Sequence, residues 1–419
     1  MEVLERHPPA PADAWSMPLG EIDVSNPNLY AEDRWQPFFA RLRRDDPVHY
    51  LKDSVYGPFW SITRFRDIMQ VEIDHETFSS DDANGGVTLQ ELPRENARPT
   101  FIRMDPPKHS AHRRTVLPAM APSAIARLRE VARENSGRIL DELPRNEEFD
   151  WVPRVSIELT SLMLAILFDY PLEDRHKLIR WSNIATYDVR DPDAEVHSEA
   201  ERYQEMLNFG EHIGEYWDRR AAEPPRDDDL ISLLAHGEAT RDFDFLDRMG
   251  VLLVLLGGGN DTSRNSMSGG LWAFHNNPAE WQKLRDDPAL VPDAVQETIR
   301  YQTPVLYQRR TATRDVELGG KTIAKGDRVA LWYISGNFDE TEFAEPERFI
   351  VGRPKARQHV SFGAGIHRCV GARIAEMQIR ILWDEVLRRD MKIEVTEAPA
   401  YSYNNLFRNI TSMKVRIRG

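Results

Sequence analysis

Apolar residues recur at spacings of three and four along most of the chain, which is the pattern of helices that bury one face. Proline-containing pairs such as Pro224-Pro225, Asn277-Pro278 and Asp287-Pro288 separate these segments, because proline ends one helix or opens the next. The pattern predicts helices over Pro122–Leu143, Val155–Leu167, Ala200–Ala222, Leu246–His275, Ala279–Arg285, Pro292–Gln302 and Val370–Arg389.

Strand patterns are few and short by comparison. We expect strands at Val316–Leu318, Lys321–Ile323, Arg328–Trp332, Lys392–Val395 and Met413–Ile417. Gly319-Gly320 is typical of a tight hairpin turn between the first two. Because no repeat or low-complexity linker divides the chain, we expect one domain over residues 1–419, mainly α with small peripheral β-sheets. Residues 1–15, rich in charge and proline, are expected to be a flexible segment.

Composition excludes several classes of protein. The chain has 54 Lys and Arg against 68 Asp and Glu, a formal net charge of −14, whereas a general nucleic-acid binder would carry a basic surplus. The longest apolar runs, Val251–Leu256 and Leu162–Phe168, are too short to span a bilayer, and the N-terminus has no apolar targeting segment. One cysteine excludes an intrachain disulfide. We therefore expect a cytoplasmic protein that binds no nucleic acid and spans no membrane.

That cysteine, Cys369, lies in a glycine-rich segment directly before a predicted helix. Glycine at positions 363, 365 and 371 allows tight turns and the close approach of another group. A cysteine at a helix N-terminus lies near free N–H groups and the positive end of the dipole, which favour a thiolate that can attack or bind a metal. An inert buried cysteine and a zinc site with His359 and His367 are the alternatives.

The segment from Phe362 to Gly371 has the pattern Phe-x-x-Gly-x-x-x-Cys-x-Gly and resembles the haem-binding loop of the cytochrome P450 monooxygenases. The resemblance implies a triangular helical domain that encloses haem b. It implies that Cys369 is the axial ligand of the iron and that Phe362 and Gly371 contact the cofactor. His367 stands where many members have Arg, and an imidazole can still donate to a haem propionate.

A second segment resembles the same family. Glu297 and Arg300 are three residues apart and so share one helix face. Alone, such a pair is an ordinary surface ion pair. Ahead of the cysteine loop it resembles the family's Glu-x-x-Arg motif, and Arg348 in the segment Pro346–Phe349 is expected to complete a structural network with it.

A third segment resembles the family's clamp for the haem propionates. His109 and Arg113 are four residues apart on a helix that follows Pro106-Pro107, and Arg310 lies in a second matching segment. Buried carboxylates require cationic donors, which these side chains would supply.

The segment Leu252–Thr262 resembles the family's oxygen-activation groove and is expected to be a core helix interrupted by glycine. Three mid-helix glycines, Gly257 to Gly259, cost about 3 kcal/mol relative to alanine, so a local need must offset them. The resemblance implies that Asp261 relays protons and that Thr262 hydrogen-bonds the oxygen being activated. The alternative is a simple helix kink with satisfied side chains.

Two longer stretches, Gly258–Gly270 and the segment from Gly365 to Trp383, resemble the soluble bacterial alkane-hydroxylating branch of the family. The resemblance implies O2-dependent hydroxylation of the terminal carbon of medium-chain n-alkanes. The expected pocket residues are Val254, Gly257, Gly258, Val305, Leu306, Leu406 and Phe407. The alternative substrates are a terpenoid and a fatty acid whose carboxylate would be anchored by Arg94, Arg98 or Arg180. The alternative functions are a non-catalytic haem sensor and a hydroxylase that uses peroxide instead of O2.

Electrons must come from other proteins, because the chain has no flavin or nicotinamide fingerprint and no iron–sulfur cysteine set. The resemblance implies a 2Fe-2S ferredoxin with an NAD(P)H-dependent ferredoxin reductase. The expected docking patch for the ferredoxin consists of Arg113, Arg114, Arg368 and Arg373. Residues 170–214 resemble the family's mobile lid.

Overall fold

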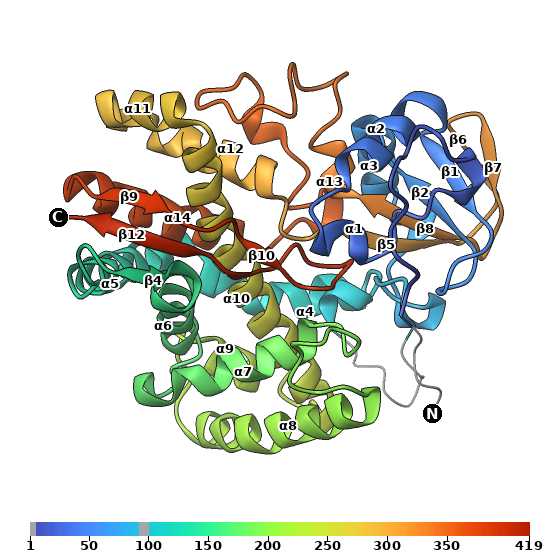
Figure 1. The fold of residues 1–419 in the computed structure, drawn as a ribbon. Coiled ribbons are helices and arrows are strands. Elements are labelled where there is room, and N and C mark those ends of the chain that lie inside the picture. Colours follow the sequence, from blue (N-terminus) through green and yellow to red (C-terminus); the bar gives the residue numbers. More distant parts are fainter. Residues whose placement is uncertain (1–5, 92–99) are drawn as a thin grey trace.

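The computed structural model describes residues 6–91 and 100–419 of the chain. Its α-helices are α1 (Asn28–Ala31), α2 (Gln36–Asp45), α3 (Phe65–Ile73), α4 (Lys108–Val116), α5 (Pro122–Asp141), α6 (Ile157–Leu167), α7 (Arg175–Thr186), α8 (Glu199–Ala222), α9 (Leu230–His236), α10 (Phe245–Asn276), α11 (Pro278–Asp286), α12 (Val291–Gln302), α13 (Tyr333–Gly336) and α14 (Ala372–Arg388). Its strands are β1 (Val48–Leu51), β2 (Phe59–Ile62), β3 (Phe78–Ser79), β4 (Glu148–Asp150), β5 (Tyr307–Ala312), β6 (Val316–Leu318), β7 (Lys321–Ile323), β8 (Arg328–Trp332), β9 (Lys392–Val395), β10 (Ala400–Tyr401), β11 (Ile410–Ser412) and β12 (Lys414–Arg418). The predicted class, mainly α with small sheets, is confirmed (Figure 1).

The long helix α10 runs through the helical part of the molecule (Figure 1) and packs against α6, α7, α8, α12 and α14. One hydrophobic cluster joins its N-terminal half to α5 through α9 and to the start of α14. A second cluster joins its C-terminal half to α12 and to the rest of α14. A helix surrounded in this way is apolar on most sides, which explains the run Val251–Leu256.

The other part of the molecule is built on a five-stranded sheet with the strand order β1-β2-β8-β5-β3. β2 and β8 are parallel, and the other neighbouring pairs are antiparallel. Large aromatic side chains, among them Phe39 of α2 and Trp332 of β8, fill the core beside this sheet. β5 carries Arg310 into the interior, where that residue is 3% exposed.

The helices and strands predicted from the sequence are confirmed to within a few residues at their ends. α14 begins at Ala372, two residues later than predicted. α10 continues through Gly257–Gly259 without a break, so the expected interruption is wrong: Gly257 and Gly259 are close-packing positions within a continuous helix. The hydrophobic pattern did not predict β5, because Arg309 and Arg310 are charged residues of the kind usually found at the surface, although both are buried in this strand.

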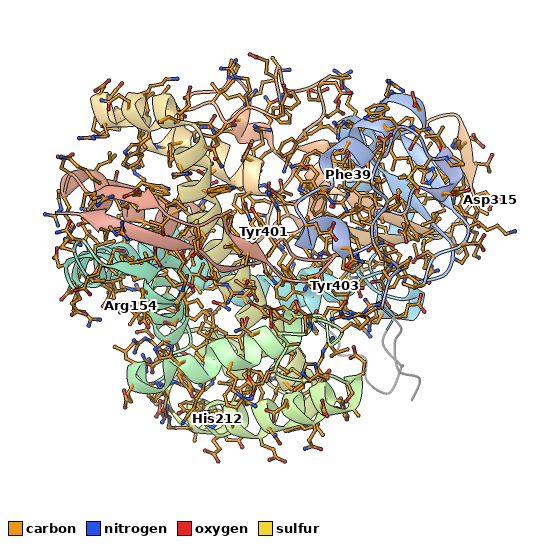
Figure 2. The ribbon with its side chains drawn as sticks, in the orientation of Figure 1. Phe39, Arg154, His212, Asp315, Tyr401 and Tyr403 are labelled. Carbon is orange, nitrogen blue, oxygen red and sulfur yellow. The ribbon has the colours of Figure 1, made fainter. Side chains whose placement is uncertain are left out.

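Residues 6–15 are mostly exposed but contact the rest of the chain at several points, and the flexibility expected for residues 1–15 stays a prediction. The Arg6 guanidinium donates to the Arg190 carbonyl oxygen at 2.7 Å, and the His7 N–H donates to the Tyr403 hydroxyl at 3.0 Å. Figure 2 shows Tyr403 near the middle of the view, above His212 on the outer helix α8. Residues 1–5 lie outside the described residues. Within the described ranges, none of the helices has the length and hydropathy to cross a membrane.

Candidate functional site

The loop that carries Cys369 is fixed by a hydrogen bond and by glycine geometry. The Cys369 N–H donates to the Phe362 carbonyl oxygen at 2.8 Å, which folds the segment back on itself. Gly363 and Gly365 both have a φ of +62°, a conformation that favours glycine. A Cβ at Gly365 would lie 2.5 Å from the Glu72 carbonyl oxygen near the end of α3. The close approach predicted for these glycines is therefore an approach to α3.

Cys369 lies just before α14, whose N-cap residue is Gly371. Burial raises the pKa of the Cys369 thiol, while N–H groups of Gly371 and Ala372 and the charges of Arg113 and Arg368 oppose that rise. Cys369 is nevertheless exposed. Its thiol is therefore accessible to a ligand.

His109 of α4 and His367 of the cysteine loop lie side by side, with ring centroids 4.4 Å apart. Burial first, then nearby arginine charges, lowers the pKa of His109 to about 4 and that of His367 to about 2, so both rings are neutral at pH 7. In the described part of the chain, neither ring has a hydrogen-bond partner at either nitrogen. Buried imidazoles need such partners, so this pair is suited to an acceptor group beside Arg113 and Arg310.

This donor set fits the two carboxylates of haem, and the Cys369 sulfur fits its iron. The residues that would hold haem are His109, Arg113, Arg310, Phe362, His367, Cys369 and Gly371. Haem, when bound, supplies the activation of O2 that C–H hydroxylation requires. The alternative zinc site at His359, His367 and Cys369 is not formed: among the described residues no group of three or more His, Cys, Asp or Glu could hold a metal ion.

Glu297 and Arg300 of α12 form a fully buried ion pair with N–O distances of 2.8 and 2.9 Å. The expectation that Arg348 completes this network is wrong. Arg353 donates to Glu297 at 2.9 Å, whereas the Arg348 side chain is exposed and pairs with Glu345. Arg348 contributes only its carbonyl oxygen, which accepts from Arg300 at 3.2 Å. Arg348 is at an exposed position, whereas Arg353 is 6% exposed, so the later arginine reaches the buried carboxylate.

The three consecutive glycines of α10 have different surroundings. A Cβ at Gly257 would lie 3.3 Å from the Thr186 side chain of α7, and one at Gly259 would lie 2.8 Å from Leu164 of α6. These two glycines let neighbouring helices pack closely against α10. Gly258 is exposed, and its Cβ position has no neighbouring atom within 4 Å.

Val254, Gly258 and Thr262 follow at intervals of four residues, so they lie on one face of α10. None of the three is buried, although helices surround α10. The Thr262 hydroxyl donates to the Gly258 carbonyl oxygen at 2.8 Å. This open face belongs to a helix that packs against α14, the helix that follows Cys369.

Asp261, which follows Asn260 on α10, is 0% exposed, and its carboxylate contacts α7. It forms an ion pair with Arg264 and accepts from the Ser182 hydroxyl at 2.9 Å and the Thr186 hydroxyl at 3.1 Å. Arg264 was not among the residues predicted from the sequence. Its position three residues after Asp261 on the same helix is the one feature of the sequence that indicates this ion pair. The acid and alcohol are neighbours in sequence, but the acid lies within a buried polar cluster.

The predicted pocket residues have different exposures. Leu306 is 0% exposed within the core beside the five-stranded sheet. Its expected role in the pocket is therefore wrong, because its side chain packs against other core residues. Gly257 is buried against α7 and does not share the open face of α10. Val305 pairs with Phe407 in an isolated β-bridge, and these two residues and Leu406 are only partly buried.

Arg180, an expected anchor for a fatty acid, is engaged elsewhere. Its guanidinium pairs with Glu195 at 2.6 Å and Glu205 at 2.8 Å on the exposed side of α7. Its charge is therefore already balanced. Arg94 and Arg98 lie outside the described residues.

The family model of cytochrome P450 matches residues 196–395. Linalool 8-monooxygenase from Pseudomonas putida is 36% identical over 410 residues, which cover 94% of this chain and 98% of that protein. The structure of cytochrome P450-153 from Novosphingobium aromaticivorans matches with a TM-score of 0.88 and 40% identity, covering 95% of this chain and 99% of that one. The Mycobacterium marinum cytochrome P450 in complex with pseudoionone matches with a TM-score of 0.86 and 30% identity over 96% and 99% of the two chains. The chain therefore belongs to the cytochrome P450 family and is a haem-dependent monooxygenase.

Proposed function

We propose that this monooxygenase, as one haem-binding domain over residues 1–419, hydroxylates the terminal carbon of medium-chain n-alkanes with O2. The observation that carries the proposal is the open face of α10, where Val254 and Gly258 present apolar or small surface next to the Thr262 hydroxyl. The resemblance of Gly258–Gly270 and of the segment from Gly365 to Trp383 to the alkane-hydroxylating branch supports the same substrate.

An alkane needs no polar anchor to bind. Burying about eight methylene-sized groups at roughly 0.8 kcal/mol each gives about 6 kcal/mol, which corresponds to a dissociation constant on the order of tens of micromolar. A methyl C–H bond is stronger than a methylene one. Terminal hydroxylation therefore requires a narrow pocket that presents the chain end first.

A terpenoid is the second candidate substrate, because two similar proteins carry terpenoid names. One is linalool 8-monooxygenase, and the other was solved with pseudoionone. Both ligands have an apolar chain with one oxygen. A fatty acid has less support, since Arg180 is paired with two glutamates.

In this proposal Asp261 delivers protons and Thr262 directs them to the reacting oxygen. Thr262→Ala is expected to lower product formed per electron pair several-fold and to release peroxide, while haem content stays unchanged. Ser266→Ala is the matched control, because the Ser266 hydroxyl donates to the Thr262 carbonyl oxygen at 2.9 Å one turn along. Product and peroxide are measured together during turnover. Undiminished coupling in Thr262→Ala contradicts the assignment.

We further propose that a 2Fe-2S ferredoxin, reduced by an NAD(P)H-dependent ferredoxin reductase in the cytoplasm, supplies the electrons. Arg114, Arg368 and Arg373 are exposed around the cysteine loop and α4 and would meet an acidic partner surface. Arg113 is partly buried and donates to the Arg368 carbonyl oxygen. It therefore contributes more to holding the cysteine loop than to the docking patch.

Optical titration of the holoprotein with n-octane, dodecanoic acid and linalool tests the substrate. A shift of the Soret band to high spin with octane, at a dissociation constant on the order of tens of micromolar, supports the alkane proposal. A shift with linalool but not octane supports the terpenoid, and a shift with the acid alone overturns both. The absence of a haem band after haem-replete expression would remove the basis of all three.

A further inference from the structure

Glu72, near the end of α3, is a buried carboxylate to which the sequence drew no attention. It is 3% exposed, accepts from Arg310 at 3.0 Å and also accepts from the Tyr333 hydroxyl. Arg310 and Tyr333 are themselves 3% and 4% exposed. Burial first, and then the charge of Glu72, raises the pKa of Tyr333, so its hydroxyl stays protonated and donates. Side chains from α3, β5 and α13 thus form a dry cluster, the Glu72 cluster.

The Glu72 cluster adjoins the cysteine loop through the backbone. The Glu72 carbonyl oxygen lies 2.5 Å from the Cβ position of Gly365, and its Oε1 atom lies 3.5 Å from that of Gly363. Arg310, a member of the cluster, is also one of the residues that would hold a haem propionate. The cluster therefore connects the loop that carries Cys369 with the unpaired donors that suit the haem propionates.

Arg310 is only partly used by its protein contacts. One terminal nitrogen donates to Glu72, and the other donates to the Arg309 carbonyl oxygen at 2.8 Å. A guanidinium has five N–H donors, so further donors remain for a carboxylate ligand. The Glu72 contact fixes the plane of the guanidinium and balances its charge before any propionate arrives.

We propose that Glu72 is a positioning residue for haem: held by Tyr333, it fixes Arg310 at the propionate edge and, as a buried anion, lowers the haem reduction potential. A negative charge in a low-dielectric region stabilises the ferric state over the ferrous state, which carries one positive charge fewer. The carboxylate acts through Arg310 and the local field and touches no substrate. This inference rests on haem binding and does not depend on the identity of the substrate.

Spectroelectrochemical titration of the substrate-free holoprotein tests the inference. Glu72→Gln keeps the shape but removes the charge, so the ferric–ferrous potential is expected to rise. Glu72→Asp keeps the charge, so its potential is expected to stay close to that of the unaltered protein. Asp46→Asn is the remote control: this carboxylate pairs with His49 and Lys321 at the β6–β7 hairpin, and its loss is expected to leave the potential unchanged.

Haem transfer to apomyoglobin separates positioning from simple structural support. A purely structural role would speed haem loss in Glu72→Gln without moving the potential, and that result overturns the proposal. Equal shifts in Glu72→Gln and Glu72→Asp overturn it too. If Glu72→Gln does not retain haem, Tyr333→Phe decides. It removes a hydroxyl dipole that partly screens the carboxylate charge, so a small further fall in the potential supports the proposal and an unchanged or higher potential refutes it.

Discussion

Two of the polar clusters in this protein, one around Glu297 and one around Arg190, differ in which parts of the chain supply their residues. The Glu297 network beside the cysteine loop joins α12 to Arg353, which is 56 positions further along the chain. The carboxylate and the Arg300 guanidinium have side-chain exposures of 0%. This network closes within the C-terminal part of the chain.

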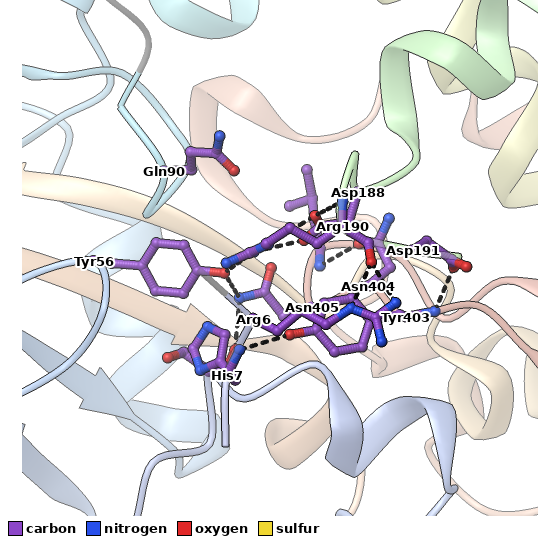
Figure 3. Close-up of polar contacts among 12 residues, drawn as sticks. Arg6, His7, Tyr56, Gln90, Asp188, Arg190, Asp191, Tyr403, Asn404 and Asn405 are labelled. Carbon is purple, nitrogen blue, oxygen red and sulfur yellow. Dashed lines mark hydrogen bonds and ion pairs between the residues drawn. The ribbon is translucent and has the colours of Figure 1, made fainter. Parts of the chain in front are cut away.

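The second cluster surrounds Arg190 in the connection between α7 and α8 (Figure 3). The Arg190 guanidinium donates to Asp188 at 2.6 Å and to the Tyr56 hydroxyl at 2.9 Å. The Tyr403 N–H donates to Asp191 at 2.7 Å, across 212 positions of the chain. The N-terminal segment joins the same cluster through Arg6 and His7.

The two clusters differ in how far apart their members lie in the chain, although both are buried. The Glu297 network is buried in the core, so every member must keep its partners. The Arg190 cluster is also buried, with side-chain exposures of 4% for Arg190 and 9% for Asp188, but it ties the α7–α8 connection to both ends of the chain. The Glu297 network therefore fixes one part of the chain, whereas the Arg190 cluster joins segments that are far apart in it.

Cys369→Ser removes the thiolate altogether and has the largest expected effect. The serine oxygen is a poor iron ligand at neutral pH, so the ferrous carbon monoxide complex is expected to lose the absorption band of a haem thiolate. The difference spectrum of reduced protein with and without carbon monoxide measures this. A retained thiolate band in the variant would contradict the ligand assignment.

Arg353→Leu leaves the Glu297 carboxylate buried with one partner fewer and is expected to destabilise the fold by about 3–5 kcal/mol. Arg348→Ala is the matched control, because its exposed side chain pairs only with Glu345 and its backbone carbonyl remains. The control is expected to cost below about 1 kcal/mol. Urea unfolding of both holoproteins measures the difference, and equal costs would restore Arg348 as the partner.

Arg190→Ala is expected to cost about 2 kcal/mol, because Asp188 and the Tyr56 hydroxyl lose a buried charged donor. Hydrogen exchange over residues 187–198 is expected to accelerate while α12 keeps its protection. Arg180→Ala breaks only exposed ion pairs on the adjacent helix α7 and is expected to cost below about 1 kcal/mol. Similar exchange in both variants would show that the order of the α7–α8 connection does not depend on Arg190.

His7 makes the Arg190 cluster sensitive to acid. Burial, then the Arg190 charge, lowers the pKa of His7 from its ordinary value near 6.5 to about 4. The folded state therefore binds fewer protons than the unfolded state, so this contribution to stability is complete above about pH 6.5 and is lost as the pH falls towards 4.

The loss attributable to His7 between pH 7 and pH 5 is expected to be between about 1 and 2 kcal/mol. His7→Gln cannot take up this proton, so its unfolding free energy should fall less over the same range. Urea unfolding of both proteins at the two pH values measures the difference. Parallel losses would assign the acid sensitivity to other groups.

The amino-acid sequence by itself determined the family, the cofactor and most of the helices. The cysteine loop is one contiguous segment in which fixed residue types follow in a fixed order, and the helices bury one face at a regular period. Both signals are local. They therefore place Cys369 and the neighbouring His367 in one loop and the three glycines, Gly257 to Gly259, in one core helix.

Only the tertiary structure decided which charged groups share a dry environment. It selected Arg353 instead of Arg348, joined Glu72 to Arg310, and enclosed Asp261 against α7. It also placed Leu306 in the core rather than in the pocket. These outcomes depend on which segments, far apart in the chain, exclude water together, because a buried charge takes whichever partner is desolvated with it.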